Sequence, residues 1–265
     1  MTQRQAPAGG ADSVSANGSA TNPIQERGTD EERWRSWGGW GALPVAALPV
    51  SGRVVVVAAH PDDEVLGFGG AIAVLAARGV ELTVVSVTDG ERSHPHSRIV
   101  TPASLARRRA QELREALAEL GAGRARIVRL GLPDTGVGRH EERIAAELAP
   151  VVRGAALVTA PWTGDVHGDH EAAGRAALRA AHDAGVPCAL YPVWMWHWAR
   201  PDDPRVPWSQ VKRIPLPLRV QALKKAAIER FTTQIRPLGP GPEEAAILPP
   251  EEIAHHLRPM EVVFQ

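Results

Sequence analysis

The sequence predicts one α/β domain in which a mostly parallel β-sheet is covered by helices on both faces. From residue 53 to about residue 200, apolar runs alternate with amphipathic stretches, and each unit takes about 30 to 40 residues, as parallel crossovers do. The apolar runs are rich in Val and Ile without polar alternation, which is typical of strands buried on both faces. A glycine follows the first amphipathic stretches, where the end of a helix favours a left-handed residue.

Four strand-and-helix units follow one another along the chain. The expected strands are residues 53–60, 81–90, 125–134 and 155–162, and the expected helices are residues 67–79, 104–122, 139–154 and 169–185. A fifth apolar run follows at residues 188–199. In it Trp194, Trp196 and Trp198 alternate like one face of a strand, so packing competes with stacking on a sugar ring. No internal repeat is visible.

The ends of the chain differ from this alternating centre. Residues 1–28 contain almost nothing large and apolar, which predicts a disordered N-terminal tail before a single domain at residues 29–265. Trp34, Trp37 and Trp40 recur every third residue, and we expect them to pack on the domain surface, a ring platform for a ligand being the alternative. Residues 201–265 are Pro-rich, with helices expected near 219–235 and 250–258, and read as an appended segment covering one edge of the domain.

Composition excludes several classes of protein. Lys plus Arg equals Asp plus Glu at 30 each, and no basic stretch is present, which argues against a nucleic-acid partner. The single cysteine, Cys188, cannot form an intrachain disulfide. No apolar run approaches the ~20 residues of a transmembrane segment, and the first 30 residues lack the pattern of a secretory signal. These observations predict a cytoplasmic protein, and they indicate no oligomeric state.

The segment that carries chemistry is AHPDDE, directly after the first apolar strand. In an open α/β sheet, ligands bind outside the carboxyl ends of the strands, and Pro61 stiffens the turn at that place. His60 and Asp63 are three residues apart and face the same side, while Asp62 points elsewhere. Adjacent ionised carboxylates repel unless a cation absorbs the charge. The motif therefore predicts a divalent metal ion with one free carboxylate beside it.

A second motif, HGDH, follows the fourth strand and supplies His167 and His170, again three residues apart. One of these imidazoles can complete the metal shell while the other faces the reacting group. Two nitrogens and one carboxylate oxygen leave an open coordination position, the arrangement of a catalytic zinc site. Each motif alone also fits a helix N-cap or a solvated turn, but their joint occurrence at two strand ends of one sheet favours the metal site.

Together, AHPDDEVLGFGG and HGDHEAAG resemble the PIG-L and LmbE-like family of zinc-dependent N-deacetylases, over residues 53 to about 200. The resemblance implies a Rossmann-like three-layer fold and one Zn²⁺ per chain. It assigns the metal to His60, Asp63 and His170, and the general base to Asp62. His167 would polarise or protonate the reacting group.

Two fainter matches concern substrate binding. The stretch RRRAQELREALAELG resembles a family helix with an arginine near the pocket, here Arg109, and LGLPD resembles a loop whose aspartate meets sugar hydroxyls, here Asp134. A plain helix-surface role is the alternative for Arg109. Gly67, Gly69 and Gly70 do not have the spacing of a dinucleotide-binding fingerprint, so they indicate close helix-to-sheet packing or room for substrate.

The resemblance implies a hydrolase that removes an acetyl group from an N-acetylated amino sugar or glycoconjugate, by attack of a metal-bound water with Asp62 as general base. Two rival hypotheses come from other classes. Two histidines and one carboxylate also describe a non-haem Fe(II) oxygenase, although that triad usually sits on a β-barrel. The third hypothesis is a non-catalytic carbohydrate-binding relative. The sequence does not choose among N-acetylated substrates.

Overall fold

The computed structural model describes residues 22–265, and its centre is a seven-stranded sheet in the order β3-β2-β1-β4-β5-β7-β6. Strands β1 to β5 run parallel to one another, whereas β7 runs antiparallel to both β5 and β6. This mostly parallel sheet confirms the predicted α/β class. The strands are β1 Arg53–Ala58, β2 Glu81–Thr88, β3 Arg126–Leu132, β4 Leu157–Pro161, β5 Cys188–Tyr191, β6 Val211–Pro215 and β7 Met260–Phe264.

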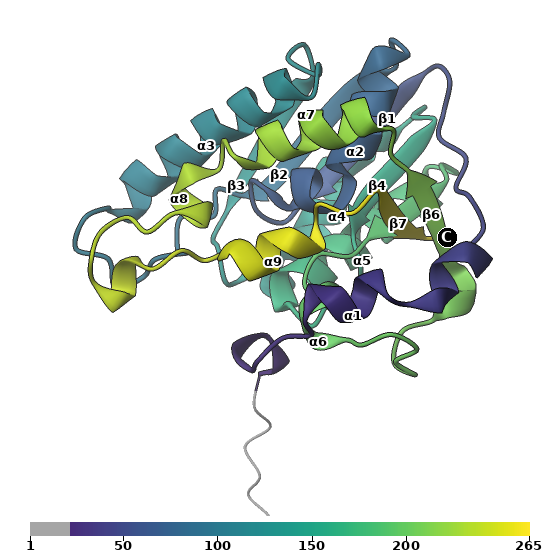
Figure 1. Ribbon diagram of the computed structural model, residues 1–265. Coiled ribbons are helices and arrows are strands. Elements are labelled where there is room, and N and C mark those ends of the chain that lie inside the picture. The colour runs from purple at the N-terminus through teal and green to yellow at the C-terminus, as the bar shows by residue number, and fades with distance from the viewer. Residues whose placement is uncertain (1–21) are drawn as a thin grey trace, which may run out of the picture.

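Helices cover both faces of the sheet, which gives the expected three layers (Figure 1). The helices α4 and α5 pack together on one face, and α2, α3 and α7 pack together on the other. The α-helices are α1 Glu31–Arg35, α2 Asp63–Ala77, α3 Pro102–Glu119, α4 Glu141–Val152, α5 Gly168–Asp183, α6 Met195–Trp198, α7 Leu218–Ile228, α8 Thr232–Ile235 and α9 Pro250–His255. Short 3₁₀ turns are η1 Pro23–Gln25, η2 Gly38–Ala42, η3 Val137–His140, η4 Trp208–Gln210 and η5 Pro242–Glu244.

Strand β1 explains why the first apolar run has no polar alternation. Val55 and Val57 point into the core under α4 and α5, and Val54 and Val56 point into the core under α2 and α3. All four valines are fully buried. A strand at the centre of a three-layer fold needs apolar side chains on both faces, so its sequence is continuous in hydrophobicity.

The position of β1 beside β4 creates the place for a ligand. After β1 the chain builds the β2 and β3 side of the sheet, and after β4 it builds the β5 side. The loops that leave β1 and β4 therefore diverge to opposite faces, through α2 and α5. Ligands of open α/β sheets bind in the crevice that such a topological switch point leaves at the carboxyl ends of the strands. Both sequence motifs follow these two strands.

The C-terminal segment, residues 201–265, extends the sheet as well as covering it. Strand β7, at the end of the chain, lies between β5 and β6, and α7 packs along α2 and α3 (Figure 1). The strand-like alternation of Trp194, Trp196 and Trp198 gave a wrong prediction. Strand β5 ends at Tyr191, before Pro192, and Met195–Trp198 form the short helix α6.

Part of the predicted tail can be described. Its residues 1–21 lie outside the described part of the chain, but η1 follows them, and the carbonyl of Glu26 accepts a hydrogen bond from His197 Nε2 at 2.9 Å. Trp34 is fully buried, with its ring centroid 5.2 Å from that of Trp196. Its indole N–H donates to the Trp196 carbonyl. Trp34 therefore packs in the core, and not on the domain surface as the sequence suggested.

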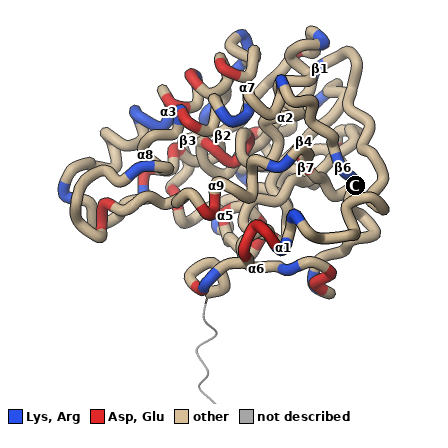
Figure 2. Tube along the Cα trace, viewed as in Figure 1, with Lys and Arg blue, Asp and Glu red and all other residues tan. Residues whose placement is uncertain are grey.

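The distribution of charged residues and the hydropathy of the helices agree with the balanced charge and the lack of long apolar runs in the sequence. Positions of both signs are interspersed over the helices and loops in Figure 2. Within residues 22–265, no helix combines the length and the apolar character that a membrane span requires.

Candidate active site

The loop between β1 and α2 is held in an unusual backbone conformation. Asp62 has φ of 146°, a region that non-glycine residues rarely adopt and that is characteristic of functional sites. Arg109, on α3, donates to the carbonyls of Pro61 and Gly90 at 2.8 and 2.9 Å. The same guanidinium pairs with Asp62 Oδ2 at 3.0 Å. The buried guanidinium of Arg109 therefore holds the loop in this conformation.

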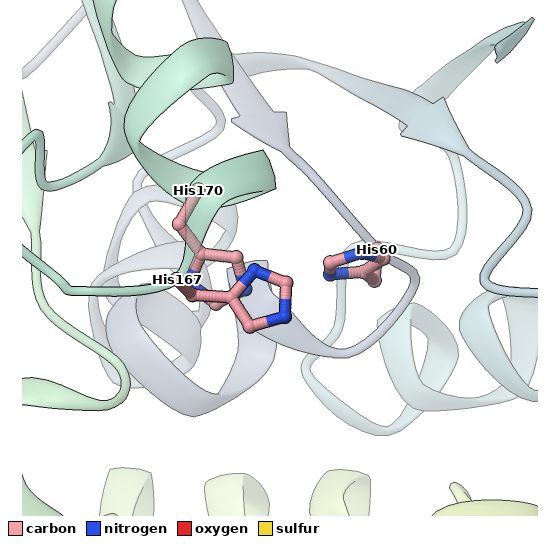
Figure 3. Close-up of side chains that lie close together, drawn as sticks. All are labelled: His60, His167 and His170. Atoms are coloured by element: carbon pink, nitrogen blue, oxygen red, sulfur yellow. The ribbon is translucent and has the colours of Figure 1, made fainter. Parts of the chain in front are cut away.

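The three predicted histidines converge at this loop (Figure 3). The ring centroids of His167 and His170 are 4.4 Å apart, and those of His60 and His170 are 5.3 Å apart. Asp63 joins two of the imidazoles: its Oδ1 lies 3.2 Å from His170 Nε2 and its Oδ2 lies 3.5 Å from His60 Nδ1. Atoms that share one tetrahedral zinc ion at ~2.0–2.1 Å are about 3.4 Å apart. Each of these two separations is close to that value, and the two contacts use different oxygens of Asp63.

Outer carboxylates hold the far nitrogen of each of these two imidazoles. Asp165 Oδ2 lies 2.7 Å from His170 Nδ1, and Asp134 and Asp169 lie 3.2 and 3.3 Å from His60 Nε2. A carboxylate in this position takes the imidazole N–H and leaves the other nitrogen with its lone pair. Both lone pairs then face Asp63, an arrangement that requires either two protons or a cation at the centre.

The pKa values of the two imidazoles show that the site favours positive charge. Burial alone would lower the pKa of His170, but Asp63 and Asp165 outweigh burial and raise it to about 9. Burial likewise opposes the charged form of His60, yet hydrogen bonds with Asp134, Asp169 and Asp63 raise its pKa well above the usual value. The carboxylates around both imidazoles therefore favour positive charge at this place, and a divalent ion would supply it.

His167 has the opposite character. Burial, followed by repulsion from His170 and His60, lowers the pKa of its imidazole to about 3, so the ring is neutral. Its Nδ1 is buried and has no hydrogen-bond partner among the described residues. The imidazoles of His60, His167 and His170 have nitrogens within 4.8 Å of one another, as do ligand atoms of His60, Asp134 and Asp169. These sets are further candidates for a cation.

Asp62 lies beside this group with one oxygen free. Its Oδ2 is paired with Arg109, whereas its Oδ1 accepts no hydrogen bond from the described residues. Burial and the nearby Asp63 together raise the pKa of Asp62 to about 6, against the attraction of Arg109. A carboxylate with this pKa can both take and return a proton near neutral pH.

A cavity of about 230 Å³ opens on these side chains. All seven residues predicted from the sequence line it: His60, Asp62, Asp63, Arg109, Asp134, His167 and His170. Its other walls include Leu66, Ser93, Trp194, Gln234 and Leu248. The topology thus brings every predicted site residue to one place, while their individual roles stay predictions.

Sequence reasoning missed two buried acids. Asp165 accepts backbone N–H groups of Val193, Trp194 and Met195 at 2.9–3.0 Å besides facing His170, and its spacing of five residues before His170 gave no signal. Glu64 is fully buried in the first turn of α2. Burial, helped by Asp62, raises its pKa to about 8, so it is mostly neutral at pH 7.

Comparison with known proteins shows which family the residues around this site resemble. Residues 55–181 match the family model "PIG-L: GlcNAc-PI de-N-acetylase". A 1D-myo-inositol 2-acetamido-2-deoxy-alpha-D-glucopyranoside deacetylase of Catenulispora acidiphila is 32% identical over 215 residues, covering 70% of this chain and 64% of the relative. The diacetylchitobiose deacetylase of Thermococcus kodakarensis is 30% identical over 140 residues, covering 51% of each chain. This chain therefore spans between half and two thirds of these relatives.

Among solved structures, the N,N'-diacetylchitobiose deacetylase of Pyrococcus horikoshii superposes with a TM-score of 0.54 at 24% identity, covering 67% of this chain and 68% of that one. This level of similarity concerns the fold, and it agrees with the parallel sheet and switch point described above. The matched residues 55–181 contain both motifs of the site. Residues 55–181 of this chain therefore match the PIG-L family, as the two motifs predicted.

Proposed function

We propose that this protein is a metal-dependent hydrolase that removes the acetyl group from an N-acetylated amino sugar or glycoconjugate. The observation that carries the proposal is the free Oδ1 of Asp62 beside an assembly of imidazoles and carboxylate that calls for a cation. The names of the relatives, which describe deacetylases of acetamido sugars, support the substrate class.

His60, Asp63 and His170 would hold the metal, and we propose Zn²⁺. Nitrogen ligands with one carboxylate are the donor set of catalytic zinc sites, and the outer carboxylates Asp165 and Asp169 fix the imidazoles for ligation. A bound divalent ion supplies Lewis-acid chemistry: it lowers the pKa of water and polarises an amide carbonyl.

The residues of the chain perform the proton transfers. Asp62 takes a proton from the water molecule whose oxygen attacks the acetyl carbon, and Arg109 keeps that carboxylate in place. The neutral His167 donates a hydrogen bond to the carbonyl oxygen as negative charge develops on it. The bond between carbon and nitrogen then breaks, and the proton on Asp62 passes to the leaving amine, which gives acetate and a free amino sugar.

Arg109 and Asp134 were predicted to contact the substrate. Both line the cavity, but each already has partners: Asp134 Oδ1 meets His60, and its Oδ2 accepts the N–H of Arg92 at 2.8 Å. Their roles toward the sugar stay predictions, as does the cytoplasmic location.

The test is acetate release by the zinc-loaded protein from a panel of N-acetylglucosamine conjugates, with a chelator-treated sample as control. We expect release that is lost on metal removal and restored by zinc. Oxygen consumption with Fe(II) and a 2-oxo acid, in place of acetate release, would support the oxygenase. Zinc binding without turnover on any acetamide would support the non-catalytic relative.

A further inference from the structure

A buried ion pair lies directly behind the helix that carries Asp63. Lys224 Nζ, on α7, and Glu261 Oε1, on β7, are 2.6 Å apart, and the two residues are 2% and 4% exposed. Both belong to the C-terminal segment, outside the residues that match the family. A buried ion pair is weak evidence for stability, because desolvation of both charges offsets their attraction. The reason for burying this pair must therefore be sought in its other contacts.

Those contacts are with the backbone of α2. Glu261 accepts the N–H groups of Gly70 and Ala71 at 2.6 and 2.9 Å. Lys224 donates to the Leu66 carbonyl at 2.8 Å, and His256 Nδ1 lies 3.2 Å from the same oxygen. In an α-helix the N–H of residue 70 points at the carbonyl of residue 66. Side chains from the far end of the sequence therefore engage both groups of one helical step.

Gly70 makes this approach possible. A Cβ at position 70 would lie 2.5 Å from Leu216 side-chain atoms and 3.1 Å from Glu261 Oε1. Any other residue would clash with Leu216 and crowd the carboxylate at the backbone N–H groups. This explains one of the glycines in GFGG, for which the sequence indicated only close packing or room for substrate.

The helical step of α2 from Leu66 to Gly70 is connected to the candidate active site through Leu66. Its N–H donates to the carbonyl of Asp62 at 2.9 Å, its side chain lines the cavity, and its carbonyl receives Lys224. Leu66 is thus the one residue between the ion pair and Asp62, the proposed base. The first turn of α2, residues 63–66, is held at its start by Arg109 through Asp62 and at its end by Lys224.

We propose that the Lys224–Glu261 pair is a positioning device: by binding the α2 backbone at Leu66, Gly70 and Ala71, it sets the direction of the first turn and so aims Asp62 and Asp63. This inference rests on the proposed function for its catalytic consequence. It does not rest on it for metal binding, since Asp63 carries a ligand carboxylate whatever the reaction.

The experiment replaces the pair by apolar residues in Lys224→Met/Glu261→Leu. Apolar replacement of a buried ion pair is often neutral for stability, and the freed groups of Leu66 and Gly70 can bond to each other as in an ordinary helix. We expect a folded protein whose dissociation constant for zinc, measured by competition with a chelator, rises about tenfold. With an acetamide substrate, kcat falls while KM stays within about twofold.

The matched control is Glu31→Gln. Glu31 is also a carboxylate bound by a cation of the C-terminal segment, Arg258. Its other side-chain partners among the described residues are His255 and Arg35, and none of these bonds is to α2. Its zinc affinity and kcat should equal those of the wild type. A folded double variant with wild-type zinc affinity and kcat would overturn the proposal.

If the double variant does not fold, Lys224→Arg decides the question, because it keeps the charge but not the single compact ammonium that reaches both Leu66 and Glu261. Weakened zinc binding is expected, and wild-type binding would overturn the proposal. Because zinc affinity needs no turnover, a wild-type protein that binds zinc but releases no acetate refutes the proposed function and leaves the positioning role to be decided by the same measurement.

Discussion

The part of the chain that matches the family model, residues 55–181, differs from the C-terminal segment, residues 201–265, in what its buried charges contact. In the first, His60, Asp62 and Asp63 follow one strand and His170 follows another, and all face the cavity. In the second, Lys224 and Glu261 face the backbone of α2, and Gln234 and Leu248 supply part of the cavity wall. One region brings reactive groups, and the other holds and encloses them.

The largest effect should follow from Asp62→Asn, which tests the first region. Without a base, kcat should fall by about 10²–10⁴-fold, while zinc content, measured by plasma emission, stays at the wild-type level. Asp89→Asn is the matched control, because Asp89 follows β2 and pairs with Arg129 outside the cavity lining. Wild-type turnover in Asp62→Asn would remove this residue from the mechanism.

Asp165→Asn tests the support of a proposed ligand. In Asp165 both carboxylate oxygens accept hydrogen bonds, from three backbone N–H groups and from His170. An asparagine amide has only one accepting oxygen, so the imidazole of His170 loses its fixed orientation. We expect zinc to bind ~10–100-fold more weakly, as measured by chelator competition. Asp183→Asn, at the exposed end of α5, should leave the affinity unchanged. An unchanged affinity in Asp165→Asn would mean that His170 is oriented by packing alone.

Arg109→Gln separates a substrate contact from support of Asp62. Loss of the charged hydrogen bond to Asp62 should cost about 1.5 kcal/mol, so kcat falls about tenfold and KM changes little. Arg107→Gln, on the exposed side of the same helix, serves as control. A rise in KM at constant kcat would instead support the substrate contact predicted from the sequence.

Gln234→Ala tests the wall that the C-terminal segment contributes. Gln234 is buried, lines the cavity, and donates to Thr233 Oγ1 at 2.9 Å and to Ser93 Oγ at 3.3 Å. Its loss should raise KM by about 2–10-fold, the value of one hydrogen bond, with kcat nearly constant in steady-state assays. Gln221→Ala, on α7 away from the cavity, should match the wild type. A fall in kcat alone would place Gln234 with the supporting residues.

The smallest effect concerns acid stability at the junction of the two chain ends. Burial opposes ionisation of Glu31, but hydrogen bonds from His255 and Arg258 lower its pKa below the usual value. A carboxylate with a lowered folded-state pKa stabilises the fold above its unfolded pKa of ~4.3 and loses this contribution as pH falls through the folded pKa. The free energy of unfolding in urea should therefore differ between wild type and Glu31→Gln at pH 7, and the difference should shrink towards pH 3. A difference independent of pH would contradict this.

The features that the sequence alone determined follow from local patterns of residues. The run RVVVV had to be a central strand, because both faces of β1 are buried, and motifs at the carboxyl ends of parallel strands meet at one edge. This geometry follows from the strand order, and it is why the five residues of the two motifs could be predicted to share one cavity. Arg109 and Asp134, which also line it, were predicted from the family resemblance. The spacing of His60 and Asp63 likewise fixed their common direction within one turn.

The tertiary structure alone decided what no local pattern encodes. Asp165 faces His170 because the N–H groups of residues 193–195, which follow β5, bind its carboxylate. These residues lead into the short helix α6, where the alternation of tryptophans suggested a strand. Glu261 reaches Gly70 across 191 positions, because β7 inserts beside β5 at the end of the chain. Contacts over such separations depend on the packing of whole elements, so they become visible only once the layers are assembled.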